Sequence, residues 1–178
     1  MQVIKILMRS AVDFEIEDKD GDRAVHHAAF GDEPEVIKLL HRGGADLNVR
    51  NKRRQTPLHI GVNKGHLGVV KELLELGCHP SLQDSEGDTP LHDAISKKRD
   101  DMLTLLLEHG ADVIVANNNG FNALHHAALR GNPSAMRILL SKVMICVACS
   151  TSDSILIVFS SLSEHVVAFL AATTVDCG

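Results

Sequence analysis

The chain has 178 residues and a mass of 19.3 kDa, which suits one domain or a short repeat array. It is 44% hydrophobic and 23% charged, carries a formal net charge of −5, and contains neither Trp nor Tyr. Its charge argues against a phosphate-binding surface and its composition against an aromatic stacking platform, so we expect no nucleic-acid partner.

The first residues do not predict export. Residues 1–8 form a short apolar cluster containing Lys5, without the longer apolar core and cleavage site of a secretory signal. No uncharged apolar run reaches the roughly 18 residues that a membrane span requires. We therefore expect a cytoplasmic protein without a membrane span, whose four cysteines are reduced thiols.

A constant period organises the chain. The histidines that mark it, His26, His59, His92 and His125, stand at equal intervals of 33 positions. The same interval separates Gly44, Gly77 and Gly110. A register kept over four units predicts a repeat protein, in which each unit packs on its neighbours.

Within a unit the residues predict a helix, a turn and a second helix. Thr56 and Thr89 suit N-cap positions, and Pro57 and Pro90 suit the first helical position, where no N–H is needed. The histidine one turn later is placed to bond nearby backbone and tie one repeat to the next. A leucine-rich second helix follows, and the glycine after it allows a positive φ.

The Thr-Pro-Leu-His segments at 56–59 and 89–92 resemble the signature of the ankyrin repeat, with degenerate copies at 23–26 and 122–125. The resemblance implies an all-α solenoid of paired antiparallel helices joined by hairpin fingers. Four repeats cover residues 18–142. Residues 1–17 align with the second half of a truncated preceding repeat.

Three positions depart from the repeat pattern. Arg54 occupies the glycine position of the second finger, where a positive φ costs a non-glycine residue roughly 1 kcal/mol. Lys98 replaces the glycine between the helices of the third repeat, which predicts a longer or looser turn. In the first repeat Gly31 comes one residue early, and we expect Pro34 to lie in an added residue that restores the register.

Finger sequences point to a narrower resemblance. Residues 51–59, 77–84 and 117–126 are similar to the ankyrin region of the mind bomb family, animal E3 ubiquitin ligases that promote endocytosis of Notch ligands. In that family zinc-containing domains recognise ligand tails and RING fingers recruit the ubiquitin-conjugating enzyme. We find neither here, so the resemblance implies a non-catalytic segment of such a ligase. A stand-alone ankyrin adaptor or inhibitor that masks its partner is the alternative.

The repeat pattern stops at Val143, and residues 143–178 form an atypical apolar tail without Lys or Arg. Capping-box spacing at 161–164 predicts a short helix over residues 162–172, placed to cover the end of the fourth repeat. The competing interpretation, which we favour, is a splice or read-through tail without selected structure.

Metal and catalytic chemistry find little support. The pairs His26–His27 and His125–His126 are metal-ligand candidates, but the period already gives the first histidine of each pair a structural role and supplies no four-ligand spacing. Cys146 and Cys149 form a lone CxxC, which is half of a zinc site. We expect no enzymatic activity, cofactor, metal or small-molecule substrate.

The fingers alternate in charge and are the candidate partner-binding surface. The first finger, residues 15–22, is acidic; the second, residues 48–55, is basic; and the third, residues 81–88, is acidic. The fourth, around residues 117–121, is neutral. Two interpretations stay open: mutual support between neighbouring charges, or a charged strip that orients a protein partner.

An acidic partner is favoured at the basic finger. The candidate contacts are Arg50, Lys52, Arg53, Arg54, Lys97, Lys98, Arg99, Asn118, Asn119 and Phe121. Phe121 is either an apolar anchor for the partner or a buried contact between fingers.

Overall fold

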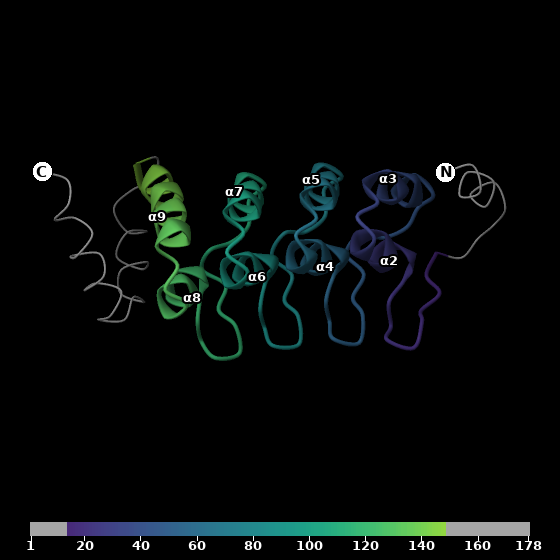
Figure 1. Ribbon diagram of the computed structural model, residues 1–178, viewed down its shortest axis with the longest axis horizontal. Helices are drawn as coiled ribbons and strands as arrows, with labels where there is room; N and C mark the ends of the chain where they lie inside the picture. Colours follow the sequence, from purple (N-terminus) through teal and green to yellow (C-terminus); the bar gives the residue numbers. More distant parts are fainter. Residues whose placement is uncertain (1–13, 149–178) are drawn as a thin grey trace, which may run out of the picture.

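The computed structural model describes residues 14–148, which form a row of helix pairs with a finger leading into each pair (Figure 1). The helices are α2 (Ala24–Phe30), α3 (Pro34–Arg42), α4 (Pro57–Lys64), α5 (Leu67–Glu75), α6 (Pro90–Ser96), α7 (Asp100–Glu108), α8 (Ala123–Leu129) and α9 (Pro133–Ala148). We call the helices next to the fingers, α2, α4, α6 and α8, the inner row, and the others the outer row. The predicted all-α ankyrin solenoid is confirmed.

Several sequence predictions fall outside the described residues. They are residues 1–13 of the half-repeat predicted over 1–17, the tail helix over 162–172, and the thiols of Cys146, Cys149 and Cys177.

The hydrophobic core runs continuously between the two rows because each repeat buries the same positions. Leu58 of α4 and Leu91 of α6 are one period apart and almost fully buried. In the outer row Val70 of α5 and Leu103 of α7 keep the same relation. Each repeat therefore buries its apolar face only against its neighbours, as a solenoid requires.

The repeat histidines tie consecutive repeats together. The Thr56 N–H donates to Nδ1 of His59 at 3.1 Å, and Nε2 of His59 lies 3.2 Å from the carbonyl oxygen of Asp88. Because a backbone N–H can only donate, Nδ1 must accept, so the ring proton lies on Nε2 and is donated to that carbonyl. Burial lowers the pKa of His59 and so favours this neutral ring.

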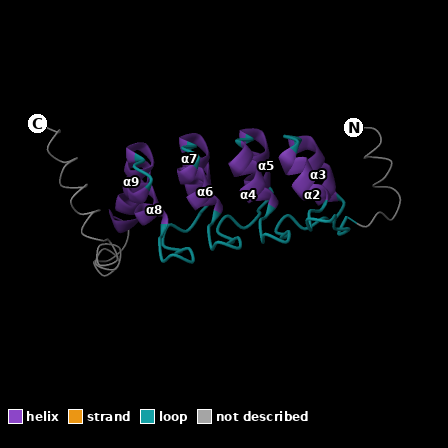
Figure 2. Ribbon diagram, turned by 60° about the horizontal axis from the view of Figure 1, so that its bottom comes forward, coloured by secondary structure: helices purple, strands orange, loops and turns teal. Residues whose placement is uncertain are grey.

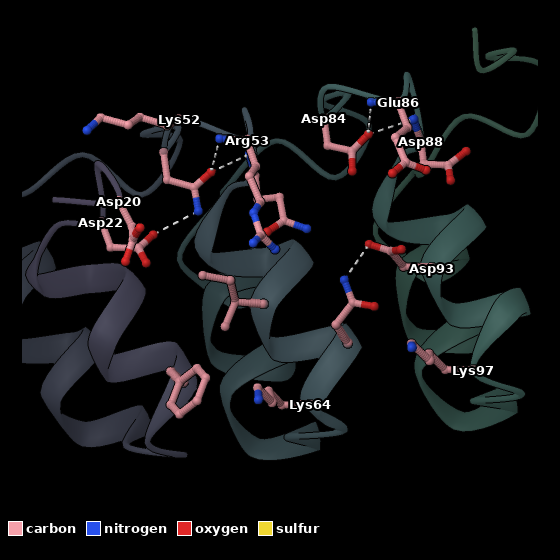
Figure 3. A pocket seen from close by; sticks show the side chains of 15 residues that line it. Asp20, Asp22, Lys52, Arg53, Lys64, Asp84, Glu86, Asp88, Asp93 and Lys97 are labelled. Atoms are coloured by element: carbon pink, nitrogen blue, oxygen red, sulfur yellow. Dashed lines mark hydrogen bonds between the residues drawn. The ribbon is translucent and has the colours of Figure 1, made fainter. Parts of the chain in front are cut away.

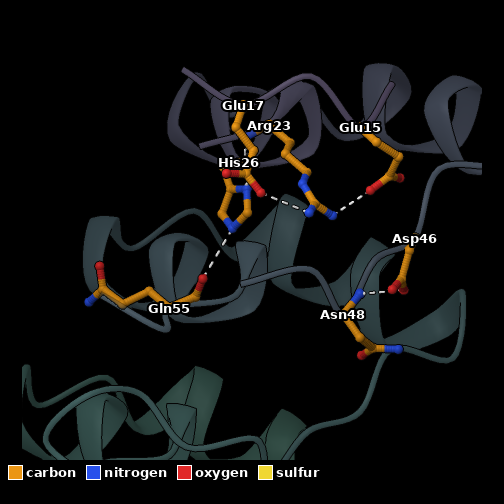
Figure 4. Close-up of polar contacts among 7 residues, drawn as sticks. All are labelled: Glu15, Glu17, Arg23, His26, Asp46, Asn48 and Gln55. Atoms are coloured by element: carbon orange, nitrogen blue, oxygen red, sulfur yellow. Dashed lines mark hydrogen bonds and ion pairs between the residues drawn. The ribbon is translucent and has the colours of Figure 1, made fainter. Parts of the chain in front are cut away.

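The same link recurs in the repeats on either side. Nε2 of His26 lies 3.1 Å from the Gln55 carbonyl oxygen (Figure 4), and Nε2 of His92 lies 2.9 Å from that of Phe121. Burial lowers the pKa of both rings as well. The predicted role of these histidines, a bond from one repeat to the next, is confirmed for three of the four.

His125 differs from the other three. Its N–H donates to the Asn122 side-chain oxygen at 3.1 Å, and its Nδ1 is buried without a partner among the described residues. The carbonyl equivalent to those that accept from the other three would belong to residue 154, outside the described part of the chain.

The turns between the paired helices differ from the sequence predictions in the third and first repeats. Lys98 has a φ of 55° in the position of Gly65, whose φ is 86°. The Arg99 N–H donates to the Ala94 carbonyl at 2.9 Å, as the His66 N–H donates to that of Gly61 at 2.9 Å. The turn at Lys98 is therefore neither longer nor looser, because the packed helices on both sides impose the left-handed conformation.

The first repeat keeps the register without an added residue. Asp32 has a φ of 56° and lies one period before Gly65. Pro34 is the first residue of α3, as Leu67 is of α5. Gly31, with a φ of −86°, does not take the left-handed position, so the predicted insertion at Pro34 is wrong.

Helix α9 continues through Ala148, beyond residue 142, where the sequence predicts the end of the repeats. Gly44, Gly77 and Gly110 follow the other outer helices with positive φ. The corresponding position is Val143, a β-branched residue for which that conformation is strongly unfavourable. The stop signal is missing, and the helix runs on.

Adjacent histidines on α2 provide a test of the inter-repeat bond. His26 is 1% exposed and bonded to the next repeat, whereas the side chain of His27 is 60% exposed. We expect His26→Ala to lower the free energy of unfolding by about 2–3 kcal/mol, because it leaves a cavity and unpaired backbone groups. His27→Ala is the matched control, expected to change it by less than about 0.5 kcal/mol. Urea denaturation measures both, and equal losses would contradict the assigned role of His26.

The left-handed turn at Lys98 provides a second test. Lys98→Gly removes the steric cost of a positive φ, and we expect it to raise the free energy of unfolding by about 0.5–1 kcal/mol. The neighbouring Lys97 has a φ of −88° and gains nothing from glycine. Lys97→Gly should therefore be neutral or destabilising, and a stabilisation equal to that of Lys98→Gly would refute the explanation.

Candidate partner-binding groove

Each finger is closed by an Asp or Asn side chain that recurs once per period. The Oδ1 atom of Asp84 accepts the N–H groups of Glu86 and Asp88 at 2.9 and 3.0 Å. Three counterparts, Asp18, Asn51 and Asn117, make the same two bonds in their own fingers. This anchor is missed by the sequence analysis, although its signal, a short polar residue at a fixed place in the period, is present.

The fingers stand in a row beside the helices (Figure 2), and hydrogen bonds join each finger to the next. The amide N–H groups of Lys52, Ser85 and Asn118 donate to carbonyl oxygens of the preceding finger, at 3.1, 3.0 and 3.1 Å respectively. Side chains add to this, since Nδ2 of Asn51 donates to Asp22 at 2.8 Å. The row of fingers is therefore held by backbone and amide groups.

A groove of about 650 Å³ lies between the first three fingers and helices α2, α4 and α6 (Figure 3). Acidic side chains lining it are Asp20, Asp22, Asp84, Glu86, Asp88 and Asp93. Basic side chains lining it are Lys52, Arg53, Lys64 and Lys97. Neutral side chains lining it are Phe30, Asn51, Gln55, Ile60 and Asn63.

The charges on the finger side of the groove follow the order predicted from the sequence. The first finger contributes Asp20 and Asp22, and the second contributes Lys52 and Arg53. The carboxylates of Glu15 and Glu17 instead pair with Arg23 at the start of α2 (Figure 4). The third finger contributes Asp84, Glu86 and Asp88. Three charge blocks of alternating sign therefore face the groove.

Hydrogen bonds, rather than ion pairs, join charged side chains of one finger to the next. Asp22 accepts from Asn51, Asp88 accepts from Asn117, and Lys52 Nζ donates to the Lys19 carbonyl. Within residues 14–148 no ion pair joins one finger's side chains to those of the next. Mutual support through such ion pairs is therefore not seen in this part of the chain, and Arg53 is exposed.

Asp93 is the most strongly perturbed acid in the groove. Burial and the nearby carboxylates of Asp84 and Asp88 raise its pKa to about 7, against the opposing effect of a 2.8 Å bond from Asn63 Nδ2. The charge of the groove near α6 therefore changes close to neutral pH. Sequence analysis misses this residue because its environment arises only when α4, α6 and the third finger come together.

Three of the predicted contact residues line the groove, namely Lys52, Arg53 and Lys97. Arg50 and Arg54 belong to the same finger but do not line it. Lys98 forms the left-handed turn, and the Arg99 guanidinium lies against Gly65, where an added Cβ would come within 2.5 Å of it. The groove lining therefore includes three of the predicted basic contacts, and the others lie outside it.

The predicted contacts of the fourth finger lie outside the groove lining. Asn118 donates from its side chain to the Ser85 carbonyl at 3.0 Å, so it fastens the fourth finger to the third. Asn119 is exposed. Phe121 is half-buried, with its ring 6.3 Å from that of His125, and its carbonyl accepts the bond from His92. The contacts of Phe121 favour its interpretation as a structural residue.

At least one histidine of each pair is bonded through its ring to another residue. His26 accepts the Arg23 N–H at Nδ1 and donates from Nε2 to Gln55, so neither nitrogen offers a lone pair to a metal. His126 Nε2 lies 2.6 Å from the Ser96 hydroxyl. The described residues contain no group of three His, Cys, Asp or Glu side chains able to hold a metal ion.

No helix within residues 14–148 has the length and apolar character of a membrane span.

The pKa of Asp93 predicts a pH-dependent stability effect. A carboxyl whose pKa is raised on folding, from 3.8 to about 7, destabilises the fold as pH rises through that window and has a constant effect above it. Asp93→Asn removes the titration and keeps an oxygen that can accept the Asn63 bond. Its advantage in unfolding free energy over the wild type should grow by about 1–3 kcal/mol between pH 4.5 and pH 7.5.

Chemical denaturation of both proteins across that pH range measures the difference. The buried histidines titrate in both proteins and therefore cancel in it. A gap that stays constant with pH would contradict the raised pKa.

Comparisons with known proteins agree with this architecture. The family model described as "Ankyrin repeats (3 copies)" matches residues 1–84, 26–117 and 76–151. A stretch of 33 residues, 18% of this chain, is 79% identical to the E3 ubiquitin-protein ligase mind-bomb of Drosophila melanogaster, of which it spans 3%. Ankyrin repeats indicate a non-catalytic protein-interaction module. The chain belongs to the ankyrin-repeat family.

Proposed function

We propose that the groove binds a segment of a protein partner, and that the chain is the partner-binding part of a mind bomb-like E3 ubiquitin-protein ligase. The observation that carries the binding role is the set of alternating charge blocks facing the groove. The fingers that hold these charges are fixed by backbone and Asx hydrogen bonds. A partner consequently meets an ordered surface, and little entropy is lost in arranging it.

The link to a ligase is supported by a short match of high identity to mind-bomb and by the resemblance of the finger sequences. Fingers are where ankyrin repeats differ most in sequence, since the helices must conserve their packing positions. In this proposal the whole protein works in the cytoplasm, in ubiquitination and endocytosis of Notch ligands. The repeats hold a partner, and transfer of ubiquitin belongs to other domains.

A stand-alone adaptor is the second candidate. The same groove on a separate chain would occupy a partner without modifying it. The two roles have opposite effects on ubiquitination of the partner. A ligase segment raises it when it is part of the ligase, whereas a masking protein lowers it when added separately.

A chimera tests the proposal. Residues 18–142 replace the matching repeats of the Drosophila mind-bomb protein, and ubiquitination of a Notch ligand is measured in cells lacking the endogenous ligase. We expect the chimera to restore it. Lys52→Glu with Arg53→Glu should reduce it at least threefold, because both residues line the groove.

Lys71→Glu is the matched control. Lys71 is exposed on α5 in the outer row, paired with Glu75 at 3.7 Å, and its reversal should leave the activity unchanged. Circular dichroism shows whether each variant is folded. An inactive chimera, or equal activity of the groove and control variants, would contradict the proposal. Loss of ubiquitination when the separate chain is added to intact mind-bomb would favour the adaptor.

A further inference from the structure

The order of charge along the groove restricts what fits in it. The sign runs negative at Asp20 and Asp22, positive at Arg53, and negative at the third finger, whereas the Lys52 ammonium turns back to the Lys19 carbonyl of the first finger (Figure 3). A uniformly acidic segment would bring its charges against the carboxylates of the first and third fingers. A uniformly basic segment would meet the cations of the second. Only a segment whose own charge alternates satisfies all three blocks.

The spacing of the blocks follows from the packing of the inner row. One finger leads into each inner helix, and a backbone bond connects it to the next finger. Packed helices lie about 8–10 Å apart, so successive fingers recur at about that interval.

A polyproline II segment matches this spacing. It has three residues per turn and rises about 3.1 Å per residue, so every third side chain points the same way at intervals of about 9.3 Å. A β-strand points every second side chain the same way, at about 6.6 Å, and falls out of step with the fingers.

The groove also offers an apolar surface for prolyl rings. Phe30 is 57% exposed and lines the groove together with Ile60. Lys64 Nζ lies 4.0 Å from the centroid of the Phe30 ring and so covers only one face of it. Aromatic surface of this kind is what polyproline II segments dock against.

We propose that the groove binds a polyproline II segment of a partner protein with the charge order basic-x-x-acidic-x-x-basic. The central acidic residue contacts Arg53. The first basic residue contacts Asp20 and Asp22, and the last contacts the carboxylates of the third finger. Because the order is the same read in either direction, the segment fits in both chain directions. The inference rests on the proposed function, and it names the chemistry of the partner.

Synthetic peptides test the charge order. A fluorescent peptide with the core Arg-Pro-Pro-Glu-Pro-Pro-Arg is titrated with the full chain, alongside its permutation Glu-Pro-Pro-Arg-Pro-Pro-Arg. Both have the same composition, net charge and backbone preference. We expect the ordered peptide to bind at least tenfold more tightly by fluorescence anisotropy, and its affinity to fall at high salt, because the contacts are exposed ion pairs. Binding of the two within twofold of each other would overturn the proposal.

A charge reversal in the protein tests which finger contacts which residue of the peptide. Lys52→Glu with Arg53→Glu makes all three blocks negative, so the variant should prefer Arg-Pro-Pro-Arg-Pro-Pro-Arg over the ordered peptide. Lys71→Glu should keep the wild-type preference, since that residue lies on the outer row. An unchanged preference in the swapped variant would overturn the assignment.

The spacing has its own control. The peptide Arg-Pro-Glu-Pro-Arg keeps the charge order but shortens the interval, and it should bind at least tenfold more weakly. Equal binding would overturn the three-residue register. If all peptides fail to bind while the mind-bomb chimera still needs Lys52 and Arg53, the charge order is wrong and the proposed function stands. If the ordered peptide binds and the chimera is inactive, the ligase role fails instead.

Discussion

The bond from a buried histidine to a carbonyl of the next repeat is the interaction on which the rest of the structure depends. In His59 the two ring nitrogens have different partners, since Nδ1 accepts the N–H of Thr56 and Nε2 donates to Asp88. The first bond fixes the start of α4, and the second fixes the base of the third finger. One neutral imidazole thus couples helix capping within a repeat to the position of the next finger. The groove inherits its geometry from that coupling.

Backbone groups join each finger to the next, so the row of fingers does not depend on ion pairs between them. Asp84 closes its loop through two N–H groups, and the next finger is attached through the Glu86 carbonyl. Side chains such as Arg53 make no ion pair in the described residues and can differ between proteins without loss of the hairpin. Exposed pairs between fingers would add at most about 1 kcal/mol each, so the fold loses little by doing without them.

The fold could be predicted from the sequence because its determinants recur at one period. Helices α4 and α6 start as their local sequences predict, with Thr56 and Thr89 at the N-cap and Pro57 and Pro90 at the first helical position. The turns are harder to predict. Residue preference disfavours a positive φ at Asp32 and Lys98, but packing of the helices on either side outweighs a local cost of about 1 kcal/mol.

At Val143 residue preference outweighs the repeat register. There the sequence removes the glycine that ends an outer helix, and α9 extends to Ala148. The repeat register predicts a stop and the residue prevents it. Register therefore prevails at Lys98, where helices on both sides constrain the turn, and residue chemistry prevails at Val143.

The site was only partly predictable, because charge in sequence does not reveal which way a side chain points. Lys52 and Arg53 lie in the groove, whereas Arg99 of the predicted basic surface packs against Gly65. Asp93 had no signal of its own, since the equivalent position is Ile60 in the preceding repeat. Its raised pKa comes from burial and from the carboxylates of the third finger, which the packing of that finger on α6 brings close.

In the groove, the interval between fingers is fixed, whereas the charge at the finger tips can vary. Histidine and Asx hydrogen bonds set a constant interval between fingers, whatever stands at their tips. The residues at the tips then set the sign at each interval, so a change at Arg53 alters the charge presented there without altering the spacing. Asp93 adds a charge near α6 that depends on pH around neutrality. Spacing and charge are specified by different atoms of the same repeat, and in the function that we propose this lets one fold select partners by the order of their charges.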